Sequence, residues 1–416
     1  MLRCVLLLIG AGLARAAPPP SGADFFLKDG DRVVFYGNGV PQWPYYAAFV
    51  ETYVATRFPH LHSSFVSAEV DGDTVAGGQA GSIDLRLRRD VVLESPTVIT
   101  IMLGEHDAGW VPWNDELFRK YSTGYEHIIE SLRSSLPRTR ITLIQHSPHD
   151  DVTRPPLFEG GYNAVLMRYN QFVKELGRRE HLPVVDFNGP VVRALQKAQA
   201  ADPELARKIL PDRRHPGPGA QLVMAEALLK AWNAPVVVAA VEIDAETKRV
   251  MRANNAEVTD LRVVSSVTWT EADAALPMRL PAFDAASALV VRGSDFVETL
   301  NQEPLRVTGL AAARYSLTID GEKVGNFTRQ QLQAGINLAE LPTPMTAQAL
   351  KVYELAMRHI DVHYRRWIGI QLSMADYNSP NVLAAMDALD KLAGEIRDQE
   401  RAQAQPKPRQ YTLAPQ

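Results

Sequence analysis

The chain has 416 residues, which is enough for two or three domains with sizeable cores. Its apolar content of 46% and charged content of 22% are ordinary for a folded globular protein and exclude a wholly disordered chain. The formal net charge of -4 gives no sign of a nucleic-acid partner or of binding to an anionic membrane surface.

The first sixteen residues are typical of a secretory signal peptide. Arg3 supplies a positive start, residues 5–13 are apolar, and Ala14-Arg15-Ala16 offers a cleavage site of the small-x-small type. Cys4, the single cysteine, precedes the apolar stretch, whereas a lipid-anchored protein needs its cysteine after it. We therefore expect an exported protein, periplasmic or extracellular, whose mature chain has neither a disulfide nor a catalytic thiol. No later segment has the apolar length of a membrane span.

Residues 25–235 alternate between β-rich runs and amphipathic helical runs. The expected strands are 32–36, 63–66, 97–103, 140–145 and 183–186, and the expected helices are 45–57, 115–135, 163–180, 191–198 and 219–232. Such alternation predicts right-handed crossovers and a parallel sheet covered on both faces. Ligands of such sheets bind beyond the carboxyl ends of the strands, so we expect functional residues there.

The pattern changes after residue 235. Residues 236–343 are expected to form a small β-rich module, with strands at 236–243, 262–270, 288–292, 306–308, 316–319 and 324–327. Residues 344–400 show helical periodicity interrupted at 377–380, which predicts a helical hairpin. Residues 401–416 are rich in Gln, Pro and Lys and are expected to be a disordered tail.

Four short blocks lie at the predicted strand ends and before the last helix of residues 25–235. They are Gly37-Asn38-Gly39, Gly72-Asp73-Thr74, Gly104-Glu105-His106-Asp107 and Asp212-Arg213-Arg214-His215-Pro216. In this order they resemble the motif blocks of the SGNH/GDSL hydrolases, a family of ester hydrolases. The resemblance implies a three-layer α/β/α sandwich of the flavodoxin-like type with a five-stranded parallel sheet. It also implies an ester of a carbohydrate, lipid or small acyl compound as substrate, without a cofactor.

The resemblance also assigns roles to single residues. His215 would be the catalytic base and Asp212 the carboxylate that orients it. The backbone N–H of Gly72 would belong to the oxyanion hole, and His106 stands where the family has an asparagine donor. Gly39 stands where the family has its nucleophilic serine.

The glycine at position 39 decides the expected chemistry. Glycine has no side-chain atom that can form an acyl-enzyme, and neither Asn38 nor Val40 replaces it. Ser82 and Ser147 are further serines of the domain, but neither lies on the tight turn that aims the nucleophile. We therefore expect that conventional serine esterase activity is lost.

Three other functions stay open at the level of sequence. The domain could be a non-catalytic binding protein for an acylated glycan or similar ligand, or it could hydrolyse esters with water that His215 or a metal activates. The C-terminal half could also carry a scaffolding role. A metal would draw on histidines and aspartates near the strand ends, namely His106, His146, His149, His215, Asp107, Asp150 and Asp212. None of them has the spacing of a known metal motif, so no metal is expected.

Two loop tryptophans, Trp110 and Trp113, follow the third block. They can pack in the core, or they can stack on a ligand as exposed aromatic rings do. With Asn38 and Asp107 they are the candidate substrate-binding residues. The expected partner is a small-molecule or glycan ester, and the sequence leaves the oligomeric state open.

Overall fold

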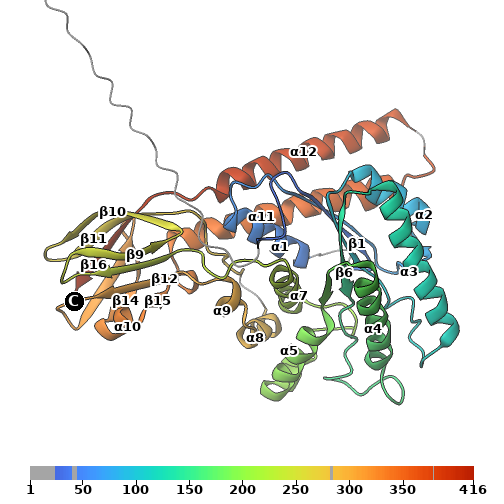
Figure 1. The fold of residues 1–416 in the computed structure, drawn as a ribbon, viewed down its shortest axis with the longest axis horizontal. Coiled ribbons are helices and arrows are strands. Elements are labelled where there is room, and N and C mark those ends of the chain that lie inside the picture. Colours follow the sequence, from blue (N-terminus) through green and yellow to red (C-terminus); the bar gives the residue numbers. More distant parts are fainter. Residues whose placement is uncertain (1–23, 40–44, 282–283, 378) are drawn as a thin grey trace, which may run out of the picture.

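The computed structural model describes residues 24–39, 45–281, 284–377 and 379–416. An α/β domain lies at one end of the molecule and a β module at the other, and two long helices run along both (Figure 1). The predicted signal peptide lies outside the described residues and stays a prediction. No helix among the described residues is long and apolar enough to cross a membrane.

The α/β domain is built on a five-stranded sheet with the strand order β2-β1-β5-β6-β7. Every neighbouring pair of strands is parallel, which confirms the predicted five-stranded parallel sheet. The strands are β1 (Arg32–Gly37), β2 (Ser64–Glu69), β5 (Val98–Met102), β6 (Arg140–Gln145) and β7 (Val184–Asp186). Because the chain leaves β1 for β2 on one side and later adds β5 on the other, the order reverses at β1, where ligands bind in this class of sheet.

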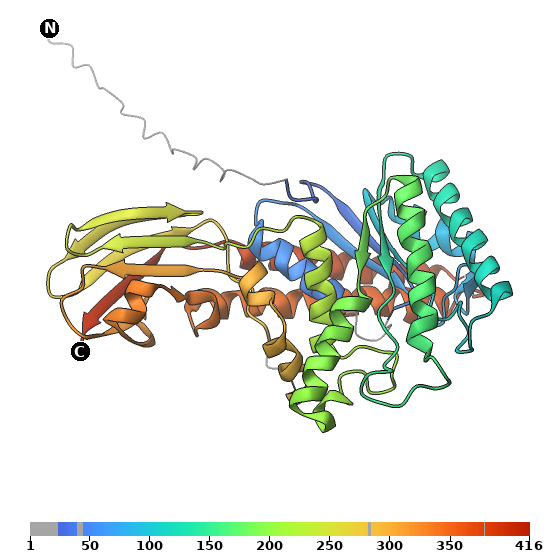
Figure 2. The ribbon, with the colours of Figure 1, turned by 60° about the horizontal axis from the view of Figure 1, so that its bottom comes forward.

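Helices cover both faces of the sheet, as the three-layer prediction requires. In β1, Val33 and Phe35 pack into the core on one face, whereas Val34 and Tyr36 pack into the core on the other. This alternation is the two-residue period of a strand. The first face is covered by α1 (Tyr45–Arg57), α5 (Asn188–Ala201) and α7 (Pro218–Ala231), and the second by α3 (Asp115–Ser135) and α4 (Tyr162–Glu180). Figure 2 shows these layers from a second direction.

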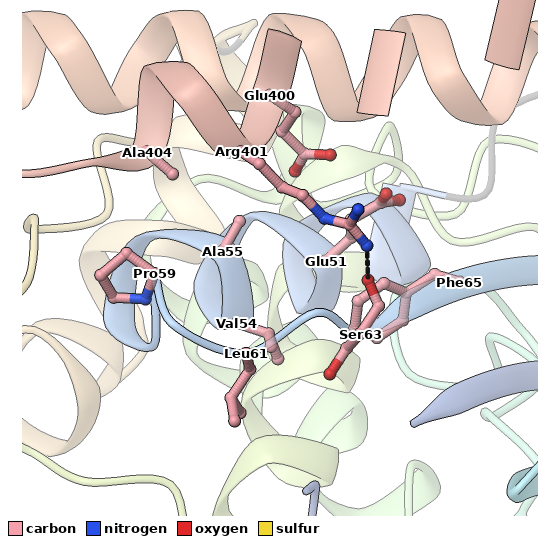
Figure 3. Close-up of a pocket in the computed structure, with 10 residues that line it drawn as sticks. All are labelled: Glu51, Val54, Ala55, Pro59, Leu61, Ser63, Phe65, Glu400, Arg401 and Ala404. Carbon is pink, nitrogen blue, oxygen red and sulfur yellow. Dashed lines mark hydrogen bonds between the residues drawn. The ribbon is translucent and has the colours of Figure 1, made fainter. Parts of the chain in front are cut away.

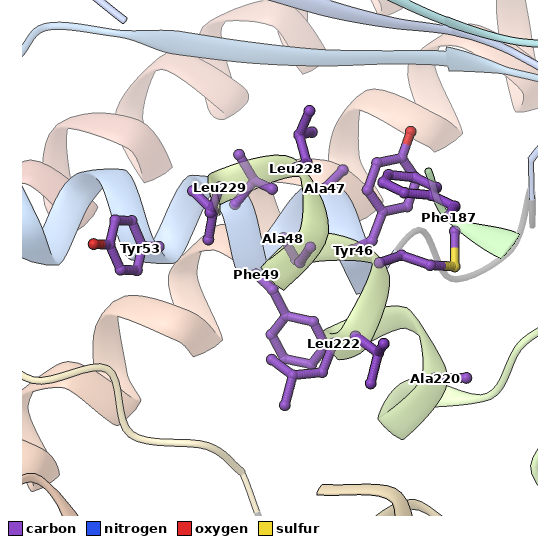
Figure 4. Close-up of a cluster of buried hydrophobic side chains, with 14 of the residues drawn as sticks. Tyr46, Ala47, Ala48, Phe49, Tyr53, Phe187, Ala220, Leu222, Leu228 and Leu229 are labelled. Atoms are coloured by element: carbon purple, nitrogen blue, oxygen red, sulfur yellow. The ribbon is translucent and has the colours of Figure 1, made fainter. Parts of the chain in front are cut away.

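Helices α1 and α7 form the tightest part of the first layer. Figure 4 shows their contact, in which Tyr46 and Phe49 of α1 lie close to Leu222 of α7. All three side chains are buried, and Tyr46 also meets the ring of Phe187 edge-on at 5.6 Å between centroids. This packing fixes the start of α1 beside the carboxyl end of β1.

Shorter elements complete the α/β domain. They are β3 (Gly77–Gly78), β4 (Gly81–Ser82), α2 (Ile83–Arg86), η1 (Leu87–Val91), η2 (Val92–Glu94) and α6 (Pro203–Ala206).

The β module contains two sheets, with the strand orders β10-β11-β16-β13-β14 and β15-β12-β8-β9. Its strands are β8 (Ala240–Asp244), β9 (Arg249–Asn254), β10 (Ala256–Val263), β11 (Val267–Asp273), β12 (Pro304–Thr308), β13 (Arg314–Ile319), β14 (Glu322–Thr328), β15 (Ile336–Asn337) and β16 (Arg409–Pro415). Two helical segments, α10 (Arg329–Ala334) and η3 (Leu338–Glu340), lie between β14 and α11. The predicted strand 262–270 is divided between β10 and β11, which pair as a hairpin.

The prediction of a disordered tail at residues 401–416 is wrong. Helix α12 continues to residue 404, and β16 pairs with β11 and β13 in the middle of a sheet. Tyr411 and Leu413 alternate into the core of the module, where the ring of Tyr411 stacks on Trp269 at 4.9 Å between centroids. Two apolar residues at strand spacing therefore outweigh the polar composition of the segment.

The predicted strand 288–292 is also wrong, because this segment lies within helix α8 (Ala285–Gly293). The Asp284 side chain caps the helix by accepting hydrogen bonds from the N–H groups of Ala286 and Ser287, both 2.9–3.0 Å long. Val290, one turn after Ala286, joins it in the core of the α/β domain. Helices α8 and α9 (Phe296–Leu300) therefore belong to the packing of the α/β domain, although they lie in the sequence of the β module.

The structure contains the expected helical hairpin. Helix α11 (Pro344–Tyr364) begins at a capping box formed by Thr343 and Thr346 and continues into the turn η4 (Arg365–Leu372). Helix α12 (Pro380–Ala404) returns beside α11, and both helices contact α1. The hairpin therefore packs on the α/β domain and leads the chain back to the β module.

Candidate functional site

The four motif blocks meet at the carboxyl end of the sheet. The first, third and fourth blocks line a small pocket of about 20 Å³, which has room for about one water molecule, and Gly72 of the second block is hydrogen-bonded to Asn38 of the first. Its described lining residues are Asn38, Gly39, Tyr46, Met102, Glu105, His146, Ser147, Arg214, His215, Pro216, Gln221 and Met224. Because a small-molecule site usually encloses ~300 Å³ or more, side chains nearly fill this one.

The base and its orienting carboxylate lie together as predicted. The Nδ1 atom of His215 is 2.5 Å from Oδ2 of Asp212, and the backbone N–H groups of Arg214 and His215 donate to Oδ1 at 3.0 and 2.9 Å. Partial burial opposes the charge on Asp212, but these hydrogen bonds from the backbone and from His215 hold the pKa of its carboxyl below the ordinary value. The Nε2 atom of His215 lies 3.4 Å from Oδ1 of Asp71.

A carboxyl group occupies the place of the missing nucleophile. A Cβ atom at Gly39 would lie 2.7 Å from Cβ of Glu69 and 2.8 Å from its Oε2 atom, closer than non-bonded atoms approach. Glu69 ends strand β2, and its Oε1 accepts a 2.6 Å hydrogen bond from the hydroxyl of Tyr46. The residue at position 39 is therefore restricted to glycine by Glu69 itself.

The carboxyl group of Glu69 is buried with only one of its oxygens satisfied. Glu69 is 3% exposed, and its Oε2 atom has no hydrogen-bond partner. Burial raises the pKa of Glu69 to about 7, although the hydrogen bond from Tyr46 lowers it in part. The group therefore titrates near neutral pH without reaching solvent.

The predicted donors of the oxyanion hole are both occupied. The N–H of Gly72, a residue with a left-handed φ of 86°, donates to Oδ1 of Asn38 at 3.1 Å. The Nε2 atom of His106 lies 2.7 Å from Nη2 of Arg214 and 3.1 Å from Oδ1 of Asp71. This imidazole nitrogen accepts from Arg214 in one tautomer and donates to Asp71 in the other, so it has a partner in either and is not free for an oxyanion.

Arg214 organises a cluster of charges over the pocket. Its Nε donates to Oε1 of Glu105 at 2.8 Å, and its Nη2 donates to Oδ1 of Asp71 at 3.1 Å. Its guanidinium also lies over the ring of Trp110, 4.8 Å from the centroid. Glu105 is 3% exposed, and burial opposes its charge, but the charge of Arg214 and the hydrogen bond from it hold the pKa of this carboxyl below the ordinary value. We name Asp71, Glu105, His106 and Arg214 the arginine cluster.

Sequence reasoning did not identify Glu69, Asp71, Glu105 or Arg214 as site residues. Glu105 lies in the third motif block and Arg214 in the fourth. Glu69 and Asp71 lie three residues and one residue before Gly72. The sequence signal for these site residues was the presence of three carboxylates, Glu69, Asp71 and Glu105, close to strand ends. Carboxylates that become buried there need partners.

Ser147 does not replace the missing serine. Its Oγ lies 3.5 Å from Nδ1 of His146, but that nitrogen is 2.9 Å from the carbonyl oxygen of Ser147, to which it donates. The other ring nitrogen, Nε2, lies 3.3 Å from the amide nitrogen of Asn38. Burial lowers the pKa of His146, so the ring is neutral and has no free nitrogen to serve as a base for Ser147.

The four candidate substrate-binding residues divide into two pairs. Asn38 and Trp110 lie at the site: the amide nitrogen of Asn38 donates to Oε2 of Glu105 at 2.9 Å, and Trp110 meets the ring of His106 edge-on at 4.6 Å. Asp107 accepts from the N–H of Val75 at 2.9 Å and so joins two loops, and burial raises its pKa to about 7. Trp113 packs against the side chains of Phe118, Tyr169 and Arg168, away from the pocket.

The histidines considered for a metal site do not converge. His149 pairs with Asp151 at 3.2 Å and meets the ring of Tyr162, whereas His146 is hydrogen-bonded within the pocket. Among the residues that the structure describes, no group of three or more His, Cys, Asp or Glu side chains could hold a metal ion.

A comparison with solved structures agrees with the fold. Over 94% of this chain and 98% of the other, the structure resembles a gut microbial diltiazem-metabolizing enzyme, with a TM-score of 0.83 and 24% sequence identity. An acetyl xylan esterase matches 48% of this chain over 98% of its own, with a TM-score of 0.38 and 14% identity. The lipase/acylhydrolase from Enterococcus faecalis matches 48% of this chain over 94% of its own, with a TM-score of 0.35 and 20% identity. No curated protein matches.

A family model gives the assignment of the α/β domain. The model of the GDSL-like lipase/acylhydrolase family matches residues 30–221, which include the glycine at position 39 and the pair His215 and Asp212. This range contains all five strands of the parallel sheet. Residues 30–221 of this chain are therefore a domain of the GDSL-like lipase/acylhydrolase family.

Proposed function

We propose that this domain is a catalytically impaired member of its family, which keeps the ester hydrolase fold and base without acyl-serine chemistry. The observation that carries the proposal is the carboxyl group of Glu69 at the place where a side chain at position 39 would lie. A serine there would need Glu69 to move, and no other serine among the lining residues has a base. A covalent acyl intermediate therefore has no group on which to form.

The oxyanion hole supports the same proposal. An acylhydrolase stabilises its intermediate with N–H donors that await the developing charge. Here the N–H of Gly72 is bonded to Asn38, and Nε2 of His106 lies against Arg214 and Asp71. Each carboxylate of the arginine cluster adds negative charge beside the place where an oxyanion would form. We infer that the site has become a closed cluster of ion pairs.

Hydrolysis through activated water is the second candidate, and the intact pair His215 and Asp212 favours it. In this mechanism His215 takes a proton from water as the water oxygen attacks the ester carbonyl, and the alcohol leaves with that proton. A small-molecule ester is the substrate class to test. Diltiazem, which carries an acetyl ester, is included because the diltiazem-metabolizing enzyme has the same architecture over nearly its whole length.

The experiment measures hydrolysis of p-nitrophenyl acetate, acetylated xylose and diltiazem by the purified protein and its variants. We expect the parent to equal His215→Ala, because neither has a nucleophile. Gly39→Ser alone should stay inert, since its new side chain meets Glu69. Gly39→Ser combined with Glu69→Ala should hydrolyse p-nitrophenyl acetate about 10²-fold faster than the parent, and adding His215→Ala should abolish this gain.

Two other outcomes would contradict the proposal or its physical explanation. If the parent hydrolyses any of the esters and His215→Ala abolishes the activity, the water mechanism is correct and catalytic impairment is not. If the double variant folds with the parent's melting temperature but gains nothing, Glu69 is not what keeps the nucleophile position closed.

A further inference from the structure

A second group of buried ionisable side chains lies far from the motif blocks, where the hairpin contacts helix α1. Glu51 of α1, Glu400 of α12 and His359 of α11 are 2%, 2% and 5% exposed. Figure 3 shows Glu51 and Glu400 on facing helices, with Arg401 beside them. Three helices from distant parts of the sequence thus bring two carboxyl groups and an imidazole together.

The contacts within this group leave acceptors unsatisfied. The Nδ1 atom of His359 is 2.8 Å from Oε1 of Glu51, but without the alignment of a hydrogen bond. Neither Oε2 of Glu51 nor Oε1 of Glu400 has a hydrogen-bond partner. Both carboxyls and Ser63 line a cavity of about 20 Å³, enough for about one water molecule. Two buried carboxyls that face each other can hydrogen-bond only if they share a proton.

The surrounding cations do not neutralise the carboxyl pair. Arg401 donates to the carbonyl oxygen of Ser63 at 3.3 Å, and Arg32 of β1 forms an ion pair with Glu94. The Nε of Arg397 is buried without a hydrogen-bond partner. The nearby His363 of α11 is neutral at physiological pH, because burial lowers its pKa to about 4.

Burial governs the protonation of the group. It raises the pKa of Glu51 to about 8 against the opposing effects of Glu400, Arg397 and Arg401. The pKa of Glu400 is raised further, by burial and by the charge of Glu51. Burial also lowers the pKa of His359 to about 4. Near neutral pH the carboxyl pair therefore holds a proton and the imidazole is uncharged.

We propose that the proton shared by Glu51 and Glu400 is a latch that keeps the hairpin of α11 and α12 docked on the α/β domain. When the pair loses this proton, two carboxylates face each other across a buried contact, and the hairpin opens. We name this pair the carboxyl latch. It depends on no property of the candidate site.

The direction of the pH dependence follows from the two opposite shifts. A carboxyl with a raised pKa stabilises docking below its ordinary value near 4.5, and this contribution is lost as the pH rises through 8. Neutral His359 has the reverse effect between pH 4 and 6.5, which offsets the loss in that range. Docking should therefore weaken mainly between pH 6.5 and 8. If the docked and the open state differ by one bound proton, the equilibrium between them changes by up to about tenfold per pH unit.

The test is hydrogen–deuterium exchange of α12 in the full chain from pH 6 to 9. Each rate is divided by the rate of the unfolded peptide at the same pH, so that only opening is compared. We expect opening to increase about tenfold from pH 6.5 to 8 in the parent. Glu400→Gln, which mimics the protonated carboxyl, should hold the hairpin closed across this range.

Two further variants make the result unambiguous. Glu51→Gln should have the same effect from the opposite helix, which separates the latch from a local change in α12. The matched control is Glu395→Gln on the exposed side of α12, which should keep the parent's pH dependence. Opening of the parent that does not change with pH, or that keeps the same pH dependence in both latch variants, would overturn the proposal.

Discussion

The α/β domain contains two arginine-centred clusters that differ in how far their arginine is exposed to solvent. Arg86, on the far side of β1 from α1, is fully buried and donates to Asp73 at 2.8 Å, to Asp90 and to the carbonyl oxygen of Ala68. Its guanidinium also lies 5.2 Å from the ring centroids of Tyr36 and Trp367. Each guanidinium nitrogen of Arg86 therefore has an acceptor, although Oδ1 of the buried Asp73 has no hydrogen-bond partner.

The arginine cluster at the candidate site is more exposed. Arg214 bonds to Glu105 and Asp71 but is a quarter exposed, and the adjacent Glu69 has an oxygen without a partner. Each cluster thus contains or adjoins one carboxyl oxygen without a hydrogen-bond partner, Oδ1 of Asp73 in the first and Oε2 of Glu69 beside the second. The comparison teaches that an unpaired atom alone does not separate a cluster inside the fold from one at the motif blocks, whereas exposure of the arginine to solvent does.

The largest expected effect disrupts the buried cluster around Arg86. Arg86→Met leaves Asp73 buried without its cation and Asp90 paired only with Arg89, and should lower the free energy of unfolding by about 3–5 kcal/mol. Urea denaturation measures this loss. Arg88→Met, an exposed neighbour, is the control and should change stability little. Equal effects of the two substitutions would mean that Arg86 does not hold the domain together.

The carboxyl group of Glu69, beside the arginine cluster, should make the stability of the protein depend on pH. The pKa of Glu69 is raised to about 7, so its stabilising contribution is present below pH 4.5 and is lost as the pH rises to 7. Glu69→Gln keeps an acceptor for Tyr46 but cannot ionise. Its free energy of unfolding should gain about 3 kcal/mol relative to the parent between pH 4.5 and 7. Parallel stability curves for the two proteins would refute the assignment.

The contact between positions 39 and 69 can be measured by a double-mutant cycle. Gly39→Ala should destabilise the protein by about 1–3 kcal/mol, because its Cβ overlaps Glu69. In a Glu69→Ala background the same substitution should cost much less. Additive effects in thermal or urea unfolding would show that the two positions do not touch.

The smallest expected effect concerns the link from the hairpin to the Arg86 cluster. The indole N–H of Trp367 donates to Oδ1 of Asp90 at 3.0 Å. Trp367→Phe removes this donor and part of the ring surface beside Arg86, which should cost about 1–2 kcal/mol. Amide exchange should rise in η4 first. A variant as stable as the parent would mean that the hairpin is held by its other contacts.

Much of the fold could be predicted from sequence because it depends on local periodicity. The helix at residues 115–135 was predicted with its observed bounds, and the carboxyl ends of the strands located the site. The strand β16 was not predicted, because only Tyr411 and Leu413 of this polar segment belong to the core of the β module.

The chemistry of the site was predictable only where a motif fixes it. The pair His215 and Asp212 lies three residues apart, so its contact is local. By contrast, Arg214 and Glu105 meet across 109 residues, and Glu69 reaches Gly39 from another strand. Sequence identifies such residues as polar, whereas only the folded chain shows which partner each one has.

The most direct test of the proposed catalytic impairment is covalent labelling with a fluorophosphonate, which reacts with activated serine nucleophiles. Intact-mass measurement should show no adduct on the parent. It should show one adduct, at position 39, on the variant that combines Gly39→Ser with Glu69→Ala, and none when His215→Ala is added. An adduct on the parent that His215→Ala abolishes would reveal an active nucleophile elsewhere and contradict catalytic impairment.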